Sequence, residues 1–306
     1  MRSIIFFTHL VLVLTFIACS KRNDSSIPIT TLPSQSDSLS VLIAKNTGAV
    51  KKILKDSSVE NFSGFKEHYI DYLNKADKPI ALYLLTVDLN NPKLSIAVGT
   101  PNNVNSLGST QRVSSMITAR NADEASNTVL AGINGDYFDF STGIPLGPVH
   151  KNGVQLRTSI SSGYKYFGLL DNGNYMIGGY DDYITYKDRL LEVIGGRHHL
   201  LTKGNVITQT DVSVAPRTTI GLRDFKKAVI MVADGRQNDH SVGLTLEECA
   251  NILRAVGVKD AVNLDGGGSS VLVSKDKNTD KYRIKNKVSD GSERAVANAL
   301  FIVQEK

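Results

Sequence analysis

Cysteine is scarce in this chain, and tryptophan is missing altogether. The 306 residues include two cysteines, Cys19 and Cys249, and no Trp. If Cys19 carries a lipid, Cys249 has no partner, and a disulfide framework is excluded. Cys249 falls on the apolar side of an expected helix, where a cysteine is most simply a small core residue. We therefore do not expect a thiol nucleophile.

A hydrophobic run long enough to span a membrane is also lacking. The run from Ile4 to Ala18 follows Arg2 and is typical of a secretory signal peptide. It ends at Cys19, in a context that resembles a bacterial lipobox, so we expect residues 1–18 to be a lipoprotein signal peptide and Cys19 to be lipidated. The protein would then be anchored in the bacterial cell envelope, on its periplasmic or outer-surface face. Cleavage with release of a soluble product is the alternative.

Charge of one sign is not concentrated anywhere. The formal net charge is +5, but acidic or apolar residues interrupt each basic stretch. We therefore expect no nucleic-acid partner, although a mild basic excess favours an anionic substrate. Residues 19–38 are rich in Ser, Thr, Pro and Asp, which predicts a flexible tether.

Apolar periodicity predicts many strands and few helices in the remaining chain. Helical spacing indicates an amphipathic helix over 39–54 and a helical piece over 64–75, so residues 39–79 are expected to form a helical N-terminal segment. Thr245 and Glu248 form a capping box that starts the best-marked helix. Because strands and helices do not alternate regularly, we expect an α+β fold with mixed or antiparallel sheets, packed helices and a single main domain over 80–306.

A glycine-rich loop follows one of the expected strands. Residues 261–264 are apolar, and they lead into Asp265, three glycines and two serines. Glycines let backbone N–H groups approach a ligand closely, and successive free N–H groups suit an anion. No Lys-Ser/Thr pair follows, so the loop is not a phosphate-binding P-loop. A plain hairpin turn, with Asp265 as a turn former, is the alternative.

Other expected strands also end in polar residues of the kind that catalysis uses. Two carboxylates together with several arginines suit hydrolysis of an anionic glycoside, because one carboxyl can protonate the leaving oxygen while the other acts as base or nucleophile. Arginine binds phosphate oxygens through two donors at once. The strand-end residues are Asn134, Asp136, Arg217, Asp234, Arg236, Asp265, Arg294 and Asn298.

Six motifs that include these residues occur in a specific order. Together they resemble the phosphodiester glycosidase family over roughly residues 80–304, which implies a catalytic domain over 80–306. The family activity would be hydrolysis of the glycosidic bond of a sugar-1-phosphodiester, with an N-acetylglucosamine-like sugar. The motifs are Asn134-Gly135-Asp136-Tyr137-Phe138, Pro216-Arg217-Thr218-Thr219-Ile220-Gly221, Asp234-Gly235-Arg236, Gly243-Leu244-Thr245-Leu246, Asn263-Leu264-Asp265-Gly266-Gly267-Gly268-Ser269 and, around Val296, Arg294 with Asn298-Ala299-Leu300.

The resemblance also implies roles for individual residues. Asp234 and Asp265 would be the catalytic carboxylates, with their order open, and Arg217, Arg236 and Arg294 would hold the phosphodiester. Backbone N–H groups of Gly266, Gly267, Gly268 and Ser269 would bind phosphate or sugar oxygens. Sugar hydroxyls would be bound, or the acids oriented, by Asn134, Asn263 and Asn298, and His150 is a candidate to line the site.

The chain departs from the family pattern at two places. Asp136 stands where a small residue is usual, and we treat it as a peripheral candidate. Gly195-Gly196-Arg197-His198-His199 replaces a Gly-Gly-x-Pro turn, and this segment is expected to be a surface loop rather than a metal site. No compact zinc-ligand spacing occurs and no cofactor is expected, although scattered Asp and carbonyl ligands leave a Ca²⁺ site open.

Two other functions remain open. A non-catalytic, glycan-binding surface lipoprotein could use the same residues to capture an anionic saccharide. A phosphodiesterase that cuts the P–O bond is a third possibility, but it usually needs clustered metal ligands, which the sequence does not display.

Overall fold

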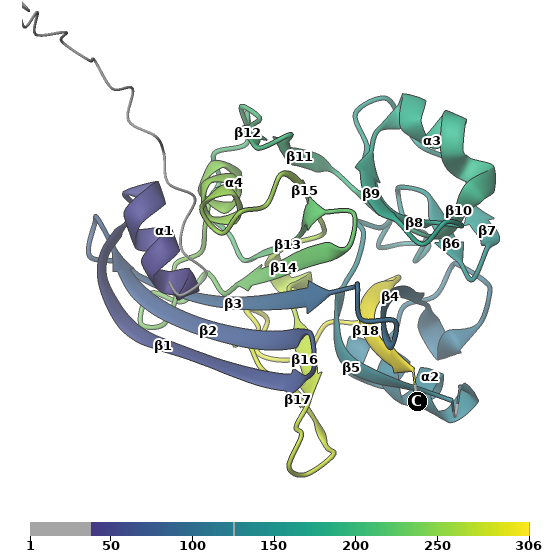
Figure 1. Cartoon of the computed structure of the whole chain (residues 1–306), viewed down its shortest axis with the longest axis horizontal. Helices are drawn as coiled ribbons and strands as arrows, with labels where there is room; N and C mark the ends of the chain where they lie inside the picture. Colours follow the sequence, from purple (N-terminus) through teal and green to yellow (C-terminus); the bar gives the residue numbers. More distant parts are fainter. Residues whose placement is uncertain (1–37, 125, 306) are drawn as a thin grey trace, which may run out of the picture. The chain divides into compact units, whose positions relative to one another are not determined.

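The computed structural model describes residues 38–124 and 126–305 (Figure 1). The predicted signal peptide and Cys19 lie outside these residues, as does the predicted tether apart from Ser38. Within the described residues there are eighteen β-strands and four α-helices. None of the helices in this part of the chain is long and apolar enough to cross a membrane.

The largest sheet has eight strands in the order β1-β2-β3-β14-β13-β15-β11-β12, and every neighbouring pair is antiparallel. β1 is an edge strand, and its exposed Lys, Asp and Glu side chains disfavour pairing with another chain. The bounds are Val50–Phe62 for β1, Phe65–Asn74 for β2, Pro79–Asp88 for β3, His198–Thr202 for β11, Asn205–Val206 for β12, Arg217–Asp224 for β13, Lys227–Ala233 for β14 and Asp260–Asn263 for β15.

Two five-stranded sheets, also antiparallel throughout, complete the β-structure. The second sheet has the order β7-β6-β10-β8-β9, with β6 Val149–Lys151, β7 Val154–Arg157, β8 Lys165–Leu170, β9 Tyr175–Gly178 and β10 Leu190–Gly196. The third has the order β17-β16-β5-β18-β4, with β4 Leu94–Gly99, β5 Asn127–Asn134, β16 Leu272–Lys275, β17 Tyr282–Ile284 and β18 Ala299–Glu305.

The three sheets share one apolar core. Leu85 of β3, Ile133 of β5, Ile194 of β10, Ile220 of β13 and Ile302 of β18 are all at most 1% exposed and belong to the same packed cluster. Burial of such side chains contributes about 1.5–3 kcal/mol each. This shared core holds the ends of strands from different sheets close together.

Helices cover the other faces of the sheets (Figure 1). α1 (Leu39–Thr47) and α4 (Leu246–Ala255) pack with the eight-stranded sheet, α2 (Val113–Asp123) with the third sheet and α3 (Tyr180–Tyr186) with the second. Three short 3₁₀ turns complete the elements: η1 (Pro101–Asn103), η2 (Lys187–Arg189) and η3 (Gly267–Ser269).

The predicted capping box of α4 is confirmed. The Thr245 side chain accepts a hydrogen bond from the Glu248 N–H at 3.1 Å, and the Glu248 carboxylate accepts one from the Thr245 N–H at 2.8 Å. Gly257, with φ of 87°, follows the helix, and N–H groups of Gly257 and Val258 donate to carbonyls of its last turn. A left-handed glycine there satisfies carbonyls that the helix leaves unpaired.

The prediction of a helical N-terminal segment over 39–79 is wrong for most of its length. The first helix ends at Thr47, because Gly48 takes a φ of 64°, and β1 begins at Val50. Residues 65–74 form β2, in which Ile70 and Tyr72 are buried while Lys66 is exposed. Aromatic and β-branched residues at alternating positions favour a strand, and this period outweighs the local helical spacing. The expected α+β fold is thus correct in its antiparallel sheets, but its helices are fewer than expected.

The Gly195–His199 segment is not a surface loop. It consists of the end of β10 and the start of β11, joined at Arg197, whose N–H donates to the Asn263 carbonyl at 3.0 Å. His198 pairs with Asn263 in the sheet, and both histidines are only partly exposed. The segment therefore carries the chain from the second sheet into the eight-stranded one.

Candidate active site

The ends of β5 and β15 meet at Asp265. The Asp265 N–H donates to the Gly135 carbonyl at 2.9 Å, and the Asn134 side-chain amide donates to the Asp265 carbonyl at 2.7 Å. The Asn134 side-chain oxygen in turn accepts from the Thr218 hydroxyl at 2.8 Å and from the Val271 N–H at 3.2 Å. Asn134 is fully buried. Its contacts fix the position of the glycine loop, and its predicted contact with sugar hydroxyls stays a prediction.

The glycine loop turns tightly and bonds largely to the protein itself. Its N–H groups donate to Asp265 Oδ1 from Gly266, to the Pro216 carbonyl from Gly267 and to the Gly266 carbonyl from Ser269. A Cβ at Gly268 would collide with Arg294 and Asp290. In this structure the glycines therefore let charged side chains approach the backbone closely, and the predicted donation of these N–H groups to a substrate stays a prediction.

Two arginines flank the loop. Arg236 is exposed, and its Nη2 lies 3.0 Å from the place that a Cβ of Gly267 would take. Arg294 donates through Nε to Asp290 at 2.9 Å and through Nη1 to the Ser269 hydroxyl at 3.4 Å. Arg236 also has a φ of 61°, a left-handed conformation that is uncommon for a side chain of this size and is often found at functional sites. The two guanidinium groups thus lie beside the loop, that of Arg294 in an ion pair with Asp290.

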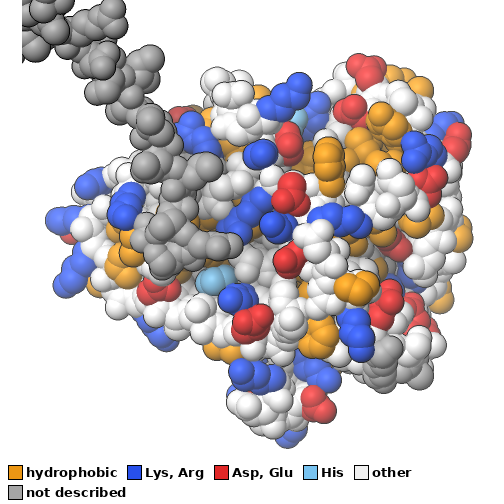
Figure 2. Space-filling view, in the orientation of Figure 1, with side chains coloured by type: hydrophobic (Ala, Val, Ile, Leu, Met, Phe, Trp, Pro, Cys, Tyr) orange, Lys and Arg blue, Asp and Glu red, His pale blue; other side chains and the backbone are white. Residues whose placement is uncertain are grey.

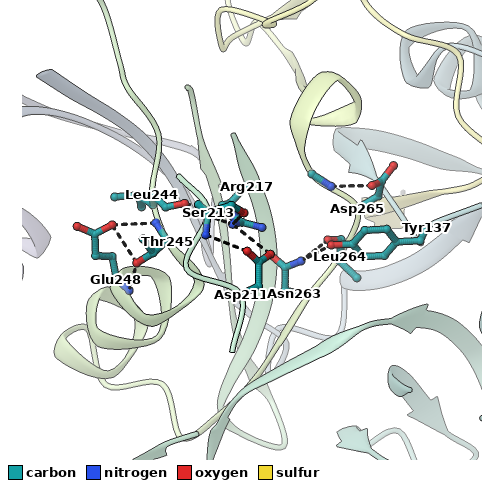
Figure 3. Close-up of polar contacts among 11 residues, drawn as sticks. Tyr137, Asp211, Ser213, Arg217, Leu244, Thr245, Glu248, Asn263, Leu264 and Asp265 are labelled. Carbon is teal, nitrogen blue, oxygen red and sulfur yellow. Dashed lines mark hydrogen bonds and ion pairs between the residues drawn. The ribbon is translucent and has the colours of Figure 1, made fainter. Parts of the chain in front are cut away.

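Arg217 has a different environment. It is 5% exposed, and its Nε donates to the Leu244 carbonyl at 3.1 Å while Nη2 donates to the Ser213 hydroxyl at 3.1 Å (Figure 3). Asp211 lies 3.8 Å from Nη2. These contacts connect the start of β13 to Ser213, which precedes it, and to Leu244, which lies just before α4. The predicted binding of a phosphodiester by Arg217 stays a prediction.

The carboxylate of Asp265 lies directly beside the loop that follows it. It is half-buried, and its Oδ1 accepts the Gly266 N–H at 2.8 Å. Burial raises the pKa of Asp265 above its ordinary value, while hydrogen bonds from Ser269 and Gly266 and the charge of Arg294 lower it in part. Figure 3 shows the Asp265 side chain beside the ring of Tyr137.

Asp136, the peripheral candidate, lies close enough to Asp265 for their charges to interact. It is 1% exposed; its Oδ2 accepts the Gly147 N–H at 2.6 Å, and its Oδ1 has no partner among the described residues. Burial raises the pKa of Asp136 to about 7, against hydrogen bonds from Gly147 and Tyr137, and the charge of Asp265 raises it further. Two neighbouring carboxyls whose pKa values are both raised by burial are a common sign of an active site.

Asp234 is instead surrounded by donors. It is 1% exposed, and its carboxylate accepts from Asn286 at 2.9 Å, from the Lys287 N–H at 2.9 Å and from His240 Nε2 at 2.8 Å. Asn286 also donates to the Ser270 carbonyl at 3.1 Å. Through Asn286 and Lys287, Asp234 thus stabilises the segment that follows the glycine loop in the sequence. Its place in a catalytic pair stays a prediction.

Two more asparagines surround the carboxylates. Asn298 accepts the Asp136 N–H at 2.8 Å, and Asn263 donates to the Tyr137 hydroxyl at 2.8 Å. Both are fully buried, yet Asn298 Nδ2 and Asn263 Oδ1 lack partners among the described residues. Buried polar atoms are usually hydrogen-bonded, so these two mark a polar interior beneath Asp265.

His150 lies in the second sheet. It is fully buried, with its ring nitrogens 3.2 Å from the Leu190 carbonyl and 2.8 Å from the Tyr183 hydroxyl. Burial lowers the pKa of His150, which favours the neutral ring. Its role in lining the site stays a prediction that these contacts do not support.

Sequence reasoning missed the contribution of the second sheet to the site. Arg197 at the end of β10 places its guanidinium carbon 5.9 Å from the centre of the Tyr137 ring. The charges of both Asp136 and Asp265 raise the pKa of Tyr164, in addition to burial as the main cause. The departure from the family pattern at 195–199 was the available signal for Arg197.

Among the described residues no group of three or more His, Cys, Asp and Glu could hold a metal ion. The Ca²⁺ site that the sequence left open stays a prediction.

Sequence comparisons relate this chain to a known family and to two known proteins. A family model described as phosphodiester glycosidase matches residues 127–303. A mouse N-acetylglucosamine-1-phosphodiester alpha-N-acetylglucosaminidase is 26% identical over 160 residues, which are 46% of this chain and 31% of the mouse protein, so the match spans about a third of that relative. An uncharacterized SPbeta prophage-derived protein of Bacillus subtilis, YomE, is 38% identical over 96 residues, 31% of this chain and 14% of that protein.

Solved structures show the same fold. The zebrafish N-acetylglucosamine-1-phosphodiester alpha-N-acetylglucosaminidase catalytic domain, auto-inhibited by its pro-peptide, matches with a TM-score of 0.61 and 23% identity over 82% of this chain and 88% of that one. A hypothetical protein from Synechocystis matches with a TM-score of 0.60 and 12% identity over 82% of this chain and 64% of that one. The family match covers more than half of the sequence and includes the glycine loop with both flanking arginines, so this chain belongs to the phosphodiester glycosidase family.

Proposed function

We propose that this protein hydrolyses the glycosidic bond of a sugar-1-phosphodiester, with Asp265 as the reacting carboxylate. Membership of the family supports a hydrolase, and the geometry of the site supports this particular reaction. The observation that carries the proposal is the glycine loop, which has Asp265 at one end and the guanidinium groups of Arg236 and Arg294 beside it.

The two arginines suit a phosphodiester anion. A phosphodiester carries one negative charge, and a guanidinium group offers donors in a fork that matches its oxygens. Arg236 is exposed and Arg294 is partly exposed, so a substrate can reach both. Arg294 already contacts Ser269, which places its positive charge next to the loop.

The chemistry needs little acid catalysis at the leaving oxygen. When the anomeric C–O bond breaks, a second negative charge develops on the phosphate, and Arg236 and Arg294 neutralise it. A phosphomonoester has a second pKa of about 6, so it leaves without full protonation. Water supplies the new hydroxyl at the anomeric carbon, and Asp265 acts as base or nucleophile for that step.

Asp136 would influence the ionisation of Asp265. Burial raises the pKa of both carboxyls, that of Asp136 to about 7. Two neighbouring carboxyls ionise one after the other, since each charge opposes the second. We therefore propose Asp136 as a positioning residue that acts through Asp265.

We further propose an N-acetylglucosamine-like sugar and a location in the cell envelope. The sugar is supported by the substrate in the name of the mouse relative, and the location by the lipobox-like sequence at Cys19. A non-catalytic glycan-binding lipoprotein is the alternative, and it does not require a carboxyl pair beside the loop.

Hydrolysis in ¹⁸O-labelled water tests the proposal. We expect N-acetylglucosamine-1-phospho-methyl ester to yield sugar that carries the label and methyl phosphate that does not. Asp265→Asn should lower kcat by about 10³-fold, a typical effect of losing a base or nucleophile. Label in the phosphate would instead indicate P–O cleavage. Sugar binding without any turnover would favour the glycan-binding alternative.

A further inference from the structure

One end of the second sheet lies against the carboxyls of the candidate active site. Strands β6 and β8 begin at this end and β7 and β10 finish there, because neighbouring strands are antiparallel. The Gly147 N–H, just before β6, donates to Asp136 Oδ2 at 2.6 Å. A Cβ at Gly147 would also lie 3.3 Å from a ring carbon of Tyr164, which is the residue before β8. This end of the sheet thus forms a wall beside Asp136.

Two arginines without ion-pair partners in the described chain belong to this wall. Arg157 is the last residue of β7, and Arg197 follows β10. Within residues 38–124 and 126–305, neither guanidinium group makes a hydrogen bond or an ion pair. Arg197 is exposed and packs on the ring of Tyr137, whereas Arg157 is only partly exposed and its Nε is buried.

An unpaired arginine on the surface does not by itself mark a site. Lys and Arg side chains are dispersed over the molecular face that Figure 2 shows. Arg157 differs because a buried donor without a partner costs free energy, and most such donors are hydrogen-bonded. A partly buried charge is also screened less by salt than an exposed one. The position of Arg157 is therefore suited to an anionic ligand.

The charged groups around this wall act on the same small region. Burial raises the pKa of Asp136, and the charge of Arg157 acts against that shift. Burial also raises the pKa of the Tyr164 phenol, and the charges of Asp136 and Asp265 add to the effect. The charges of Arg197 and Arg157 lower the pKa of Tyr164 in part. The two arginines thus lie near both carboxyls of the candidate site.

The phosphate of the proposed substrate does not need these arginines. On the proposed function, the phosphate lies at the glycine loop beside Arg236 and Arg294, and the anomeric carbon lies at Asp265. The Asp265 side chain lies beside the Tyr137 ring (Figure 3), and Arg197 packs on the same ring. The arginines of the second sheet are therefore next to the sugar and not next to the phosphate.

We propose that Arg157 and Arg197 bind a carboxylate on the hydrolysed sugar, so that the substrate is the 1-phosphodiester of an N-acetylglucosamine-like uronic acid. This inference rests on the proposed function and narrows its sugar. A guanidinium group holds its donors in a planar fork that matches the two oxygens of a carboxylate. A neutral sugar would leave both positive charges of the wall unpaired.

Two methyl esters test the inference with the full chain. One is N-acetylglucosamine-1-phospho-methyl ester, and the other has a carboxylate in place of its 6-hydroxymethyl group. We expect the wild type to prefer the uronate, and Arg157→Gln to lower kcat/KM for the uronate about tenfold more than for the neutral ester, the effect of one hydrogen bond to a charged group. Arg197→Gln should act in the same direction, and Arg157→Lys should restore part of the preference because it keeps the charge.

Arg189→Gln is the matched control. Arg189 lies just before β10, at the opposite end of that strand, where it forms an ion pair with Asp171. Its loss should leave the ratio between the two esters unchanged. If Arg157 served only to adjust the ionisation of Asp136 and Asp265, Arg157→Gln would reduce both activities equally, and that result would overturn the inference. A wild type without preference for the uronate would overturn it as well, with the proposed function intact.

Failure of the proposed function gives a different result. If the wild type hydrolyses neither ester, the proposed function fails, and calorimetry with free N-acetylglucosaminuronic acid and N-acetylglucosamine decides the inference. We then expect the wild type to bind the uronic acid more tightly, and Arg157→Gln to weaken that binding about tenfold. Equal binding of the two sugars, or binding of neither, would refute the inference.

Discussion

Replacing Asp136 by Asn should change how the stability of the protein depends on pH. The pKa of Asp136 is raised by burial from 3.8 to about 7 in the folded state. Between these two values the folded protein retains a proton that the unfolded chain has lost, so the free energy of unfolding falls as the pH rises. The loss begins near the unfolded pKa and is complete above the folded one.

The magnitude follows from the shift. A difference of about three pKa units, at 1.36 kcal/mol per unit, corresponds to about 4 kcal/mol between pH 4 and pH 8. Asn has nearly the same shape as Asp. Its side-chain oxygen can accept the Gly147 N–H, and its amide nitrogen would take the place of Oδ1, which has no partner among the described residues. The variant therefore keeps the hydrogen bond from Gly147 without the ionisation.

Urea unfolding of both proteins at pH 4.5, 6 and 8 provides the measurement. We expect Asp136→Asn to be more stable than wild type at pH 8, by up to about 4 kcal/mol, with a gap that closes toward pH 4.5. Glu192, whose pKa burial also raises to about 7, is present in both proteins and cancels in the difference. Asp139→Asn is the matched control: hydrogen bonds from Ser141 lower the pKa of Asp139 below its ordinary 3.8, so this carboxyl is ionised in both the folded and the unfolded chain from pH 4.5 to 8 and its difference from wild type should stay constant. A gap for Asp136→Asn that also stays constant across this pH range would refute the reasoning.

Four further predictions concern other parts of the chain. Thr245→Ala removes the N-cap of α4 and should cost about 1 kcal/mol in urea unfolding, whereas Thr185→Ala, at an exposed threonine within α3, should cost less. Asn134→Ala leaves the Asp265 carbonyl and the buried Thr218 hydroxyl without their partner, so it should lower the free energy of unfolding by about 3 kcal/mol. An unchanged Tm would contradict the role of Asn134 in holding the glycine loop. Arg294→Lys keeps the charge but not the fork, and it should lower kcat/KM for a phosphodiester about tenfold more than for an uncharged aryl glycoside. Cys19→Ser should abolish incorporation of labelled palmitate in bacterial cells while Cys249→Ser does not; equal labelling of both variants would exclude the lipid anchor.

Local signals in the sequence identified several elements well. The capping box at Thr245 predicted where α4 begins, because a cap depends on only a few neighbouring residues. Residues 171–174 are Asp-Asn-Gly-Asn, which is typical of a turn, and the structure has β8 and β9 on either side. The helix predicted over 64–75 is wrong, because most of these residues form β2. The strands that pair with β2 are β1 and β3, and a local pattern within 64–75 carries no information about them.

The sequence by itself determined the order of the motifs, and therefore the family, and it determined that a carboxylate and three glycines follow a buried strand. The family resemblance paired Asp234 with Asp265, but the sequence could not show the environment of these carboxyls or of Asp136. Those environments depend on burial and on hydrogen bonds between distant segments: Asp234 accepts hydrogen bonds from residues 240, 286 and 287, while Asp136 is enclosed with one oxygen unpartnered within the described residues. Only the tertiary structure sets such environments, because desolvation and charge interactions act through space and not along the chain.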